Sequence, residues 1–344
     1  MSTLSYTNVG KFQRIQLLGQ GCFGQVFKVL DTKLLEYRAL KIINAPKDDD
    51  DYVKQLKEAQ TLVSCRHRHV VDVKEADYYS VDGEKRVCIA YELVENGSVE
   101  SALKAGKVFA PFYATSIIVD ALFGMEYLHL KNPPVLHRDI KPGNLLMSSC
   151  DGIKLSDFGL ATISAHGMAT PIGYFIHMAP ETLAGHPASR LSDIYAMGLT
   201  FYRILNRKIE MMKTAPHDFE KRIVSGHFPD RNDYSQFIPD IVRKICNKAM
   251  HCNPAKRFQT ATEFRQSLER IRWGIRWDAV SPYNWVGREG ADSYVLTITS
   301  NKRFWGITYL KNARRVSSHC HKGISTEEGA FALAASIIKA TSVR

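Results

Sequence analysis

The stretch Leu136–Leu146 reads LHRDIKPGNLL and places charged and amide side chains between two apolar ends. A second short cluster, LSDFGLA at Leu155–Ala161, follows shortly after it. Residues before Gly97 read mostly as strands, and those from there to about Arg272 read mostly as helices. Both clusters lie among short strand-like runs near 135–160. This order of elements predicts a small β-rich lobe followed by a larger helical lobe.

A glycine-rich stretch, GQGCFGQV at Gly19–Val26, separates two strand-like runs near the N-terminus. Glycine lets the backbone approach a phosphate closely, and its amide groups can face phosphate oxygens. Gly19, Gly21 and Gly24 are a weak signal alone, because dinucleotide-binding folds use the same spacing between a strand and a helix. Here the following run reads as a strand, which favours a phosphate-binding loop between two strands. An ordinary hairpin turn is the alternative.

Two further residues complete a recognisable set. Lys41 lies on a third strand-like run, RALKI, and Glu58 lies in the helical pattern KEAQTL. With the clusters above, their order and spacing resemble the signature set of eukaryotic-type (Hanks-type) serine/threonine protein kinases. The resemblance runs from about Phe12 to Ile271 and is highly specific as a combination. It implies an α+β, bilobal protein kinase fold with a β-rich N-lobe and a helical C-lobe.

The resemblance also implies catalytic roles. Asp139 would orient the acceptor hydroxyl and accept its proton, and Lys141 would stabilise the γ-phosphate during transfer. Lys41 would hold the α- and β-phosphates of ATP, and Glu58 would hold Lys41. Asn144 and Asp157 would bind Mg²⁺, or Mn²⁺ as the alternative ion, because hard cations prefer oxygen ligands.

The nucleotide itself would lie between the lobes. Val26, Ala39 and Leu146 would sandwich the adenine ring, although core packing alone would also explain these three. Tyr91 falls at the gatekeeper position, so the backbone from Glu92 to Val94 would meet the adenine edge. The residues expected to bind ATP are Gly19, Gly21, Gly24, Val26, Ala39, Lys41, Glu92, Val94 and Leu146.

The activation segment, Asp157 to Glu181, carries hydroxyls that are candidate phosphorylation sites. We expect Thr170 first, then Thr162 and Ser164, with plain solvation of a loop as the alternative. Arg138 is placed to pair with such a phosphate. Tyr174 stands where the family usually has a threonine, so serine/threonine transfer, favoured by Lys141, and dual or tyrosine specificity both stay open. Ser98 and Gly143 replace acids that basophilic members carry, which gives no sign of a preference for basic substrates.

The C-terminal remainder is the densest positive region. From Ile275 onward ten basic and five acidic residues give +5 of the chain's net +11. Three strand-like runs, SYVLTITS, RFWGITYL and VSSHC, precede a helical pattern in which Ser325 and Glu328 have capping-box spacing. We expect a small basic β-β-β-α module at 286–344, after a linker at 273–285 and a kinase domain at 12–272. It weakly resembles the DNA-binding domain of plant ethylene-response factors and the second half of double-stranded-RNA-binding domains.

Composition narrows the class of protein. Of 344 residues, 45% are hydrophobic and 24% charged, as in globular proteins, and no window is apolar enough for a membrane helix. Seven scattered cysteines without a CxxC pair favour neither a disulfide framework nor a zinc site. We therefore expect a cytoplasmic protein without a membrane partner.

The sequence as a whole predicts an ATP-dependent kinase that phosphorylates serine or threonine in protein substrates, with activation-segment autophosphorylation. The C-terminal module would bind a nucleic acid or a protein. The alternative function is an adaptor that binds nucleic acid or protein, in which the kinase domain acts mainly as a switch.

Overall fold

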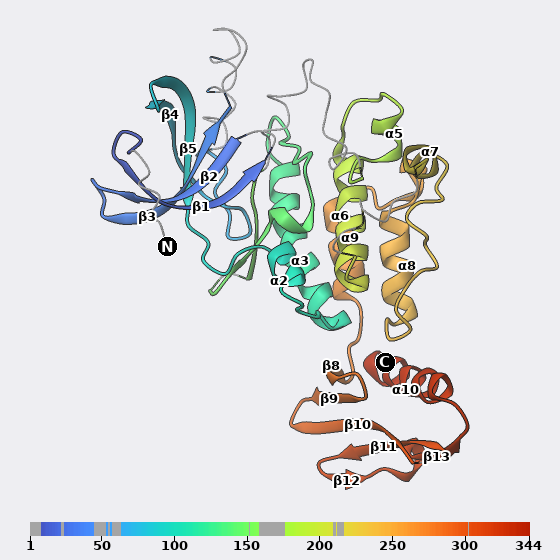
Figure 1. Ribbon diagram of the computed structural model, residues 1–344. Helices are drawn as coiled ribbons and strands as arrows, with labels where there is room; N and C mark the ends of the chain where they lie inside the picture. The colour runs from blue at the N-terminus through green and yellow to red at the C-terminus, as the bar shows by residue number, and fades with distance from the viewer. Residues whose placement is uncertain are drawn as a thin grey trace.

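The computed structural model shows two lobes and a separate C-terminal module, joined in chain order (Figure 1). The N-terminal lobe is mainly a β-sheet, the next lobe is mainly helical, and the module carries a second sheet with one long helix. The structure describes residues 8–21, 24–44, 53, 56, 63–150, 152–157, 176–208, 211, 217–301 and 303–344.

The N-terminal lobe is built on a five-stranded antiparallel sheet in the order β1-β2-β3-β5-β4. Alternating apolar residues bury one side of the strands in a small core around Val29, Leu40 and Cys88. Gly24 has a φ of +141°, and a Cβ there would lie 2.0 Å from the carbonyl oxygen of Ile42 in β3, so this position accepts only glycine. The strands are β1 Phe12–Gly21, β2 Gly24–Asp31, β3 Glu36–Ile43, β4 Val73–Val81 and β5 Glu84–Glu92.

The helical lobe surrounds a buried central helix, α6, Arg190–Asn206. Ser189 caps its N-terminus with a capping box. The Ser189 side chain accepts a hydrogen bond from the Ser192 backbone amide, and the Ser192 side chain accepts one from the Ser189 backbone amide. The other helices are α2 Val99–Lys104, α3 Pro111–His129, α5 Pro180–Leu183, α7 Phe219–Val224, α8 Asp240–Ala249 and α9 Ala261–Glu269. A short hairpin of β6 Leu145–Ser148 and β7 Gly152–Leu155, preceded by a 3-10 turn at Pro142–Asn144, lies where the two lobes meet.

The C-terminal module forms a six-stranded antiparallel sheet whose main path runs β12-β11-β10-β9-β8, with β13 beside β11. Helix α10, Glu327–Ser342, packs on one face over a core that contains Trp277, Leu296 and Tyr309. The strands are β8 Arg276–Ser281, β9 Asn284–Glu289, β10 Asp292–Ser300, β11 Trp305–Lys311, β12 Arg314–Arg315 and β13 His321–Ile324.

Three expectations for the module were wrong. Residues 273–285 are not a free linker but contain β8 and the start of β9; β8 was missed because Trp277 is its only buried residue. Val316–Cys320 does not form a strand, since Ser317–His319 makes a 3-10 turn, as serines often do. The cap of α10 is Thr326, whose side chain accepts from the Gly329 amide at 3.0 Å, rather than Ser325.

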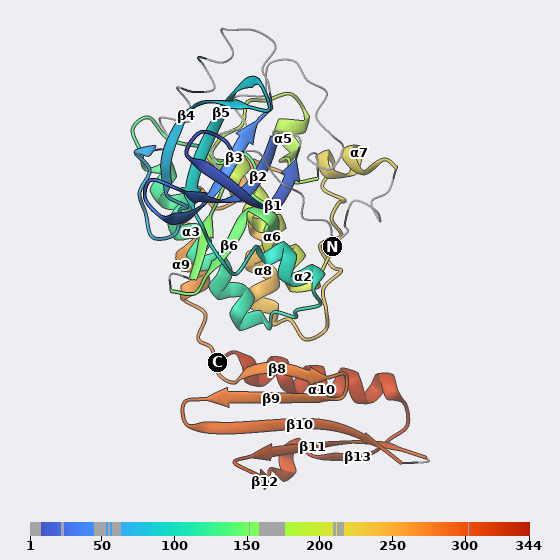
Figure 2. The same cartoon turned by 60° about the vertical axis from the view of Figure 1, so that its left-hand side comes forward.

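The module is anchored to the helical lobe through aromatic contacts and its own C-terminal end. The ring of Phe112 meets that of Trp273 edge-on at 5.4 Å, and Phe237 contacts Trp285 at 5.2 Å. Trp273 also pairs with Val343 in a β-bridge, so the end of the chain returns to the exit from the lobe. Strand β8 lies nearest the lobe and β12 lies at the far side of the sheet (Figure 2).

Among the helices that the structure describes, none is long and apolar enough to cross a lipid bilayer.

Candidate active site

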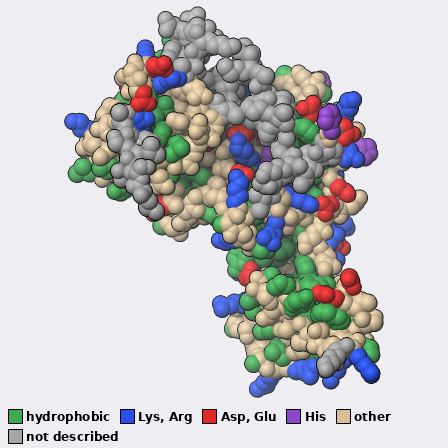
Figure 3. Space-filling model, in the orientation of Figure 1, with side chains coloured by type: hydrophobic (Ala, Val, Ile, Leu, Met, Phe, Trp, Pro, Cys, Tyr) green, Lys and Arg blue, Asp and Glu red, His purple; other side chains and the backbone are tan. Residues whose placement is uncertain are grey.

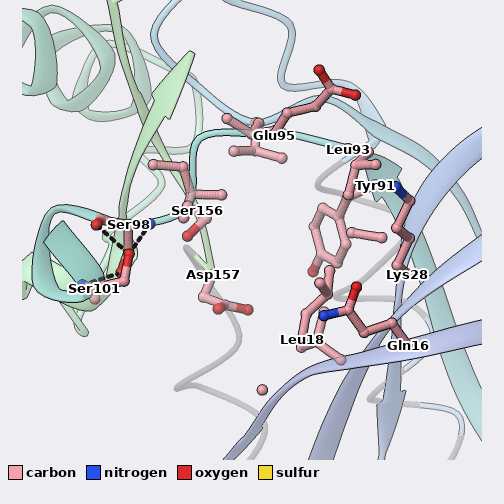
Figure 4. Close-up of a pocket in the computed structure, with 18 residues that line it drawn as sticks. Gln16, Leu18, Lys28, Tyr91, Leu93, Glu95, Ser98, Ser101, Ser156 and Asp157 are labelled. Atoms are coloured by element: carbon pink, nitrogen blue, oxygen red, sulfur yellow. Dashed lines mark hydrogen bonds between the residues drawn. The ribbon is translucent and has the colours of Figure 1, made fainter. Parts of the chain in front are cut away.

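A cleft of about 510 Å³ opens between the two lobes. Strands β1, β2 and β3 contribute one wall, the segment after β5 contributes the back, and β6 contributes the floor. Figure 4 shows side chains from both lobes around this cleft, with Tyr91 at one side and Ser98 and Ser101 at the other. Five of the residues expected to bind ATP line it, namely Gly19, Val26, Ala39, Val94 and Leu146.

The other expected nucleotide residues do not line the cleft, namely Gly21, Gly24, Lys41 and Glu92. A Cβ placed on Gly21, as on Gly19, would meet nothing within 4 Å, so both glycines border open space. Gly24 instead packs closely against the backbone of β3. The carboxylate of Glu92 points elsewhere, because it accepts hydrogen bonds from the Asp72 amide at 2.8 Å and from Lys154 at 2.9 Å. Only the backbone of Glu92 is therefore available to an adenine ring.

Tyr91 brings a polar group into this apolar part of the cleft. Its side chain is buried, and its hydroxyl has no hydrogen-bond partner among the residues that the structure describes. Burial, and then the nearby carboxylate of Asp157, raise the pKa of the phenol well above 10, so the hydroxyl stays protonated. A buried donor without a partner is costly, and a bound molecule with an acceptor would relieve that cost.

Asp139 lies at the centre of a hydrogen-bonded catalytic loop. Its Oδ2 atom accepts from Lys141 Nζ at 2.7 Å and from Asn144 Nδ2 at 2.9 Å. Asn144 Nδ2 also donates to the Asp139 carbonyl at 2.7 Å, which fixes the loop as a closed turn. The three residues that share the motif at 136–146 thus meet as side chains, and Asp139 keeps a second carboxylate oxygen for a substrate.

Asp157 faces the same cleft from the end of β7. It forms an ion pair with Lys41 of β3, which joins the two lobes across the cleft. Burial alone would raise the pKa of Asp157, but the Lys41 ammonium outweighs it and holds that pKa below its ordinary value of 3.8. The Ser156 amide donates to the Asn144 carbonyl at 3.0 Å, so Asp157 and Asn144 are held next to each other.

These donors fit a divalent cation. Asp157 contributes carboxylate oxygens, and Asn144 uses its amide nitrogen on Asp139, which leaves its side-chain oxygen for a ligand. Both are hard oxygen donors of the kind that Mg²⁺ prefers. A cation held there would lie close to Lys41, the group best placed to meet phosphate oxygens.

A buried carboxylate supports the catalytic loop from behind. Asp193 of α6 accepts from the His137 and Arg138 amides, each at 2.8 Å, and from His129 Nε2 at 2.9 Å. Arg138 has a φ of +65°, a conformation that a non-glycine residue adopts only when its surroundings hold it there. Asp193 therefore positions the backbone that carries Asp139.

The structure also reveals a polar network that no motif indicated. Arg203 Nη1 contacts His177 Nε2 at 2.7 Å, and Arg203 Nη2 lies 3.5 Å from Glu100 of α2. A Cβ on Gly143 would lie 2.8 Å from the Glu100 carboxylate, so the network reaches the catalytic loop. Its members are far apart in sequence, and only the unusual arginine inside the apolar pattern of α6 could have drawn attention to them.

This network predicts acid sensitivity. Burial, then the charges of Arg203 and Lys141, lower the pKa of His177 well below its ordinary 6.5. The folded chain keeps His177 neutral, whereas the unfolded chain takes up a proton below about pH 6.5, so stability is complete above that pH and falls below it. Between pH 6.5 and 5.5 we expect His177 to cost about 1 kcal/mol of unfolding free energy.

Urea unfolding at the two pH values measures this loss. His177→Gln keeps an acceptor for Arg203 and should lose about 1 kcal/mol less on acidification than the parent chain. His186→Gln, on an exposed histidine, is the matched control and should behave like the parent. Equal acid sensitivity in all three proteins would contradict the assignment.

Four predicted site residues lie outside the described residues. They are Glu58, the expected partner of Lys41, and the candidate phosphorylation sites Thr162, Ser164 and Thr170.

Comparison with known proteins agrees with this geometry. The protein kinase domain family matches residues 12–268. Serine/threonine-protein kinase 33 of Bos taurus is 29% identical over 263 residues, covering 72% of this chain and 52% of that protein. The probable serine/threonine-protein kinase PknB of Corynebacterium glutamicum is 26% identical over 283 residues, covering 78% of this chain and 43% of that protein.

A solved structure shows the same fold. The crystal structure of a double mutant of the Mycobacterium tuberculosis PknI kinase domain superposes with a TM-score of 0.58 at 21% identity, covering 78% of this chain and 98% of that one. The chain spans about half the length of the curated relatives, or less. The predicted bilobal kinase fold is confirmed, and the chain belongs to the protein kinase domain family.

Proposed function

We propose that this chain is an ATP-dependent protein kinase that transfers the γ-phosphate to serine and threonine hydroxyls of protein substrates. The observation that carries the proposal is the hydrogen-bonded set of Asp139, Lys141 and Asn144, which the Ser156 amide holds next to the Lys41–Asp157 pair. Kinase relatives whose names state serine/threonine specificity support it.

Each residue has a chemical task in this reaction. Bound ATP would supply the phosphoryl group, and its divalent metal would neutralise the negative charge of the phosphates. Lys41 would hold the α- and β-phosphates, and Asp157 with Asn144 would hold the metal, Mg²⁺ or Mn²⁺. Asp139 would take the proton from the acceptor hydroxyl, while Lys141 Nζ, 2.7 Å from its carboxylate, would meet the transferred phosphoryl group.

Lys141 supports serine/threonine specificity. Its Nζ lies 2.7 Å from Asp139 Oδ2, and lysine at this place is typical of the serine/threonine branch of the family. Tyr174, which takes the place of the family's usual threonine and so leaves dual or tyrosine specificity open, lies outside the described residues. We infer that the chain also phosphorylates its own activation segment, with Thr170 as the first acceptor and Arg138 as the partner of the phosphate.

An adaptor in which the kinase domain acts mainly as a switch is the alternative. An adaptor would need the nucleotide cleft but no residues for phosphoryl transfer. The hydrogen bonds that Asp139 makes with Lys141 and Asn144 therefore favour the enzyme. The proposed partner of the active enzyme is a protein substrate.

Phosphate transfer tests the proposal directly. Purified chain incubated with γ-labelled ATP, Mg²⁺ and a generic protein substrate should give labelled phosphoserine and phosphothreonine after acid hydrolysis. Excess chelator should abolish the label, because Asp157 and Asn144 need the metal to hold the phosphates. Label on tyrosine alone would overturn the specificity, and no label on any substrate or on the chain itself would overturn the enzyme.

A further inference from the structure

Another cavity, of about 140 Å³, lies between the helical lobe and the C-terminal module. In the space-filling view hydrophobic side chains gather at this neck between the two parts (Figure 3). The cavity shares no lining residue with the nucleotide cleft. It is called the neck cavity below, and it is lined mainly by residues 108–112, Phe237 and Ile238 of the lobe and by residues 275–279, Trp285 and Ile338 of the module.

Aromatic rings form much of the wall of the neck cavity. Phe112 meets Trp273 edge-on at 5.4 Å, and Phe237 lies 5.2 Å from Trp285, so rings from the lobe and the module contact each other here. These contacts hold the module on the lobe, yet they leave a cavity between the rings. Aromatic faces and edges attract a further ring more specifically than an aliphatic chain. The lining rings are Phe109, Phe112, Phe237, Trp273, Trp277 and Trp285.

The volume of the neck cavity sets the size of its occupant. An engineered cavity of about 150 Å³ with apolar walls stays dry and binds benzene. The neck cavity has nearly that volume, at about 140 Å³. Water needs two to four polar partners to be held in a cavity, and aromatic walls offer few of them. One small ring system therefore matches the space better than a cluster of waters or a long chain.

Asp278 of β8 is the acceptor in this wall. Its side chain is half-buried, and within the described part of the chain it forms no hydrogen bond or ion pair. Burial raises the pKa of Asp278, because the surroundings disfavour its charged form. A carboxylate taken partly out of water without a donor is costly. A ligand that donates one hydrogen bond would relieve that cost.

The charges of the wall select an uncharged ligand. Arg276 and Asp278 are the two charged residues that line the neck cavity, so their charges cancel. Arg276 is already engaged, since its guanidinium lies over the ring of Phe112 at 4.1 Å. An anion would face Asp278 and a cation would face Arg276, each with a like charge nearby. An N–H or O–H donor on a neutral ring meets Asp278 without that repulsion.

We propose that the neck cavity binds a small, uncharged aromatic molecule with one N–H or O–H donor, its ring among the aromatic side chains and its donor on Asp278. This site is separate from phosphoryl transfer and does not require it. Because the ligand would contact both the lobe and the module, binding should raise the melting temperature of the full chain.

Calorimetric titration of the full chain with indole, a fused ring with one N–H donor, tests the proposal. Binding should release heat, because apolar ligands that enter poorly hydrated pockets are frequently enthalpy-driven. 1-Methylindole lacks the donor and should bind about tenfold more weakly, the loss of one hydrogen bond to a half-exposed charged acceptor. In Asp278→Ala the two molecules should bind alike, because the acceptor has gone. Excess ADP should not displace indole, since the nucleotide cleft lies elsewhere.

A bulky side chain in the wall locates the site. Ala279 lines the neck cavity from β8 and is exposed, so Ala279→Trp adds volume there without removing a buried side chain. This variant should lose indole binding while the ligand-free chain keeps its melting temperature and kinase activity. Ala332→Trp makes the same change at an exposed position of α10 outside the cavity and should bind indole like the parent.

Four results would overturn the proposal. They are no binding at the solubility limit of indole, displacement of indole by ADP, equal binding of indole to the Ala279→Trp and Ala332→Trp chains, and tighter binding of charged phenethylammonium or benzoate than of indole. Equal affinity of the parent for indole and 1-methylindole would remove Asp278 from the site.

Discussion

Replacing Asp139 with asparagine will lower the turnover of phosphoryl transfer by about 10²- to 10⁴-fold. The amide keeps an oxygen that accepts from Asn144 and Lys141, so the loop geometry survives, but it cannot take a proton from the acceptor hydroxyl. Initial rates with γ-labelled ATP at saturating nucleotide measure the loss. Because Asp139 is not among the residues that line the nucleotide cleft, ATP affinity should change by no more than a few-fold.

The control is Asp240→Asn, the same chemical change on α8, where the carboxylate is 72% exposed. It should retain the parental rate. If Asp139→Asn kept its turnover within about tenfold of the parent while binding ATP normally, Asp139 would be no general base. If ATP binding and melting temperature fell together, the change would have damaged the fold and the rate would carry no information about the proton.

Much of the site was predictable because the motifs are local. The catalytic loop brings together three residues that lie within six positions of one another, Asp139, Lys141 and Asn144. Their side chains therefore meet whenever this loop folds. The family resemblance named Lys41 and Asp157 as site residues, but it did not predict the ion pair between them, since no periodicity links residues 116 positions apart. The roles of these residues remain predictions that the experiments above test.

The unpredicted features depend on contacts between distant segments. The Arg203–His177–Glu100 network joins α6, the end of the activation segment and α2, and only Arg203 stands out in its own stretch, as an arginine in an apolar pattern. The sequence did not show that β8 extends the module's sheet to Arg276. Basic and aromatic residues interleave along the module, yet strand register sends Trp277, Trp285 and Tyr309 to the side of α10 and Arg276, Arg288 and Arg315 to the opposite side.

Arg257→Ala should lower the free energy of unfolding by about 3–5 kcal/mol. The Arg257 side chain is fully buried and contacts both oxygens of Glu181, at 2.7 and 2.6 Å. It also donates to the carbonyl oxygens of His251 at 2.6 Å and Leu191 at 2.9 Å. Truncation leaves a largely buried carboxylate and several carbonyl groups without donors, and those lost partners dominate the cost.

Urea unfolding of two matched variants separates this effect from the loss of any arginine. Arg222→Ala removes a half-exposed partner of Asp218, 3.8 Å away, and should cost no more than about 1 kcal/mol. The double variant Arg257→Ala, Glu181→Ala should lose less than the two single losses combined, because the second change removes the stranded charge. Additive losses would mean that the pair is not coupled.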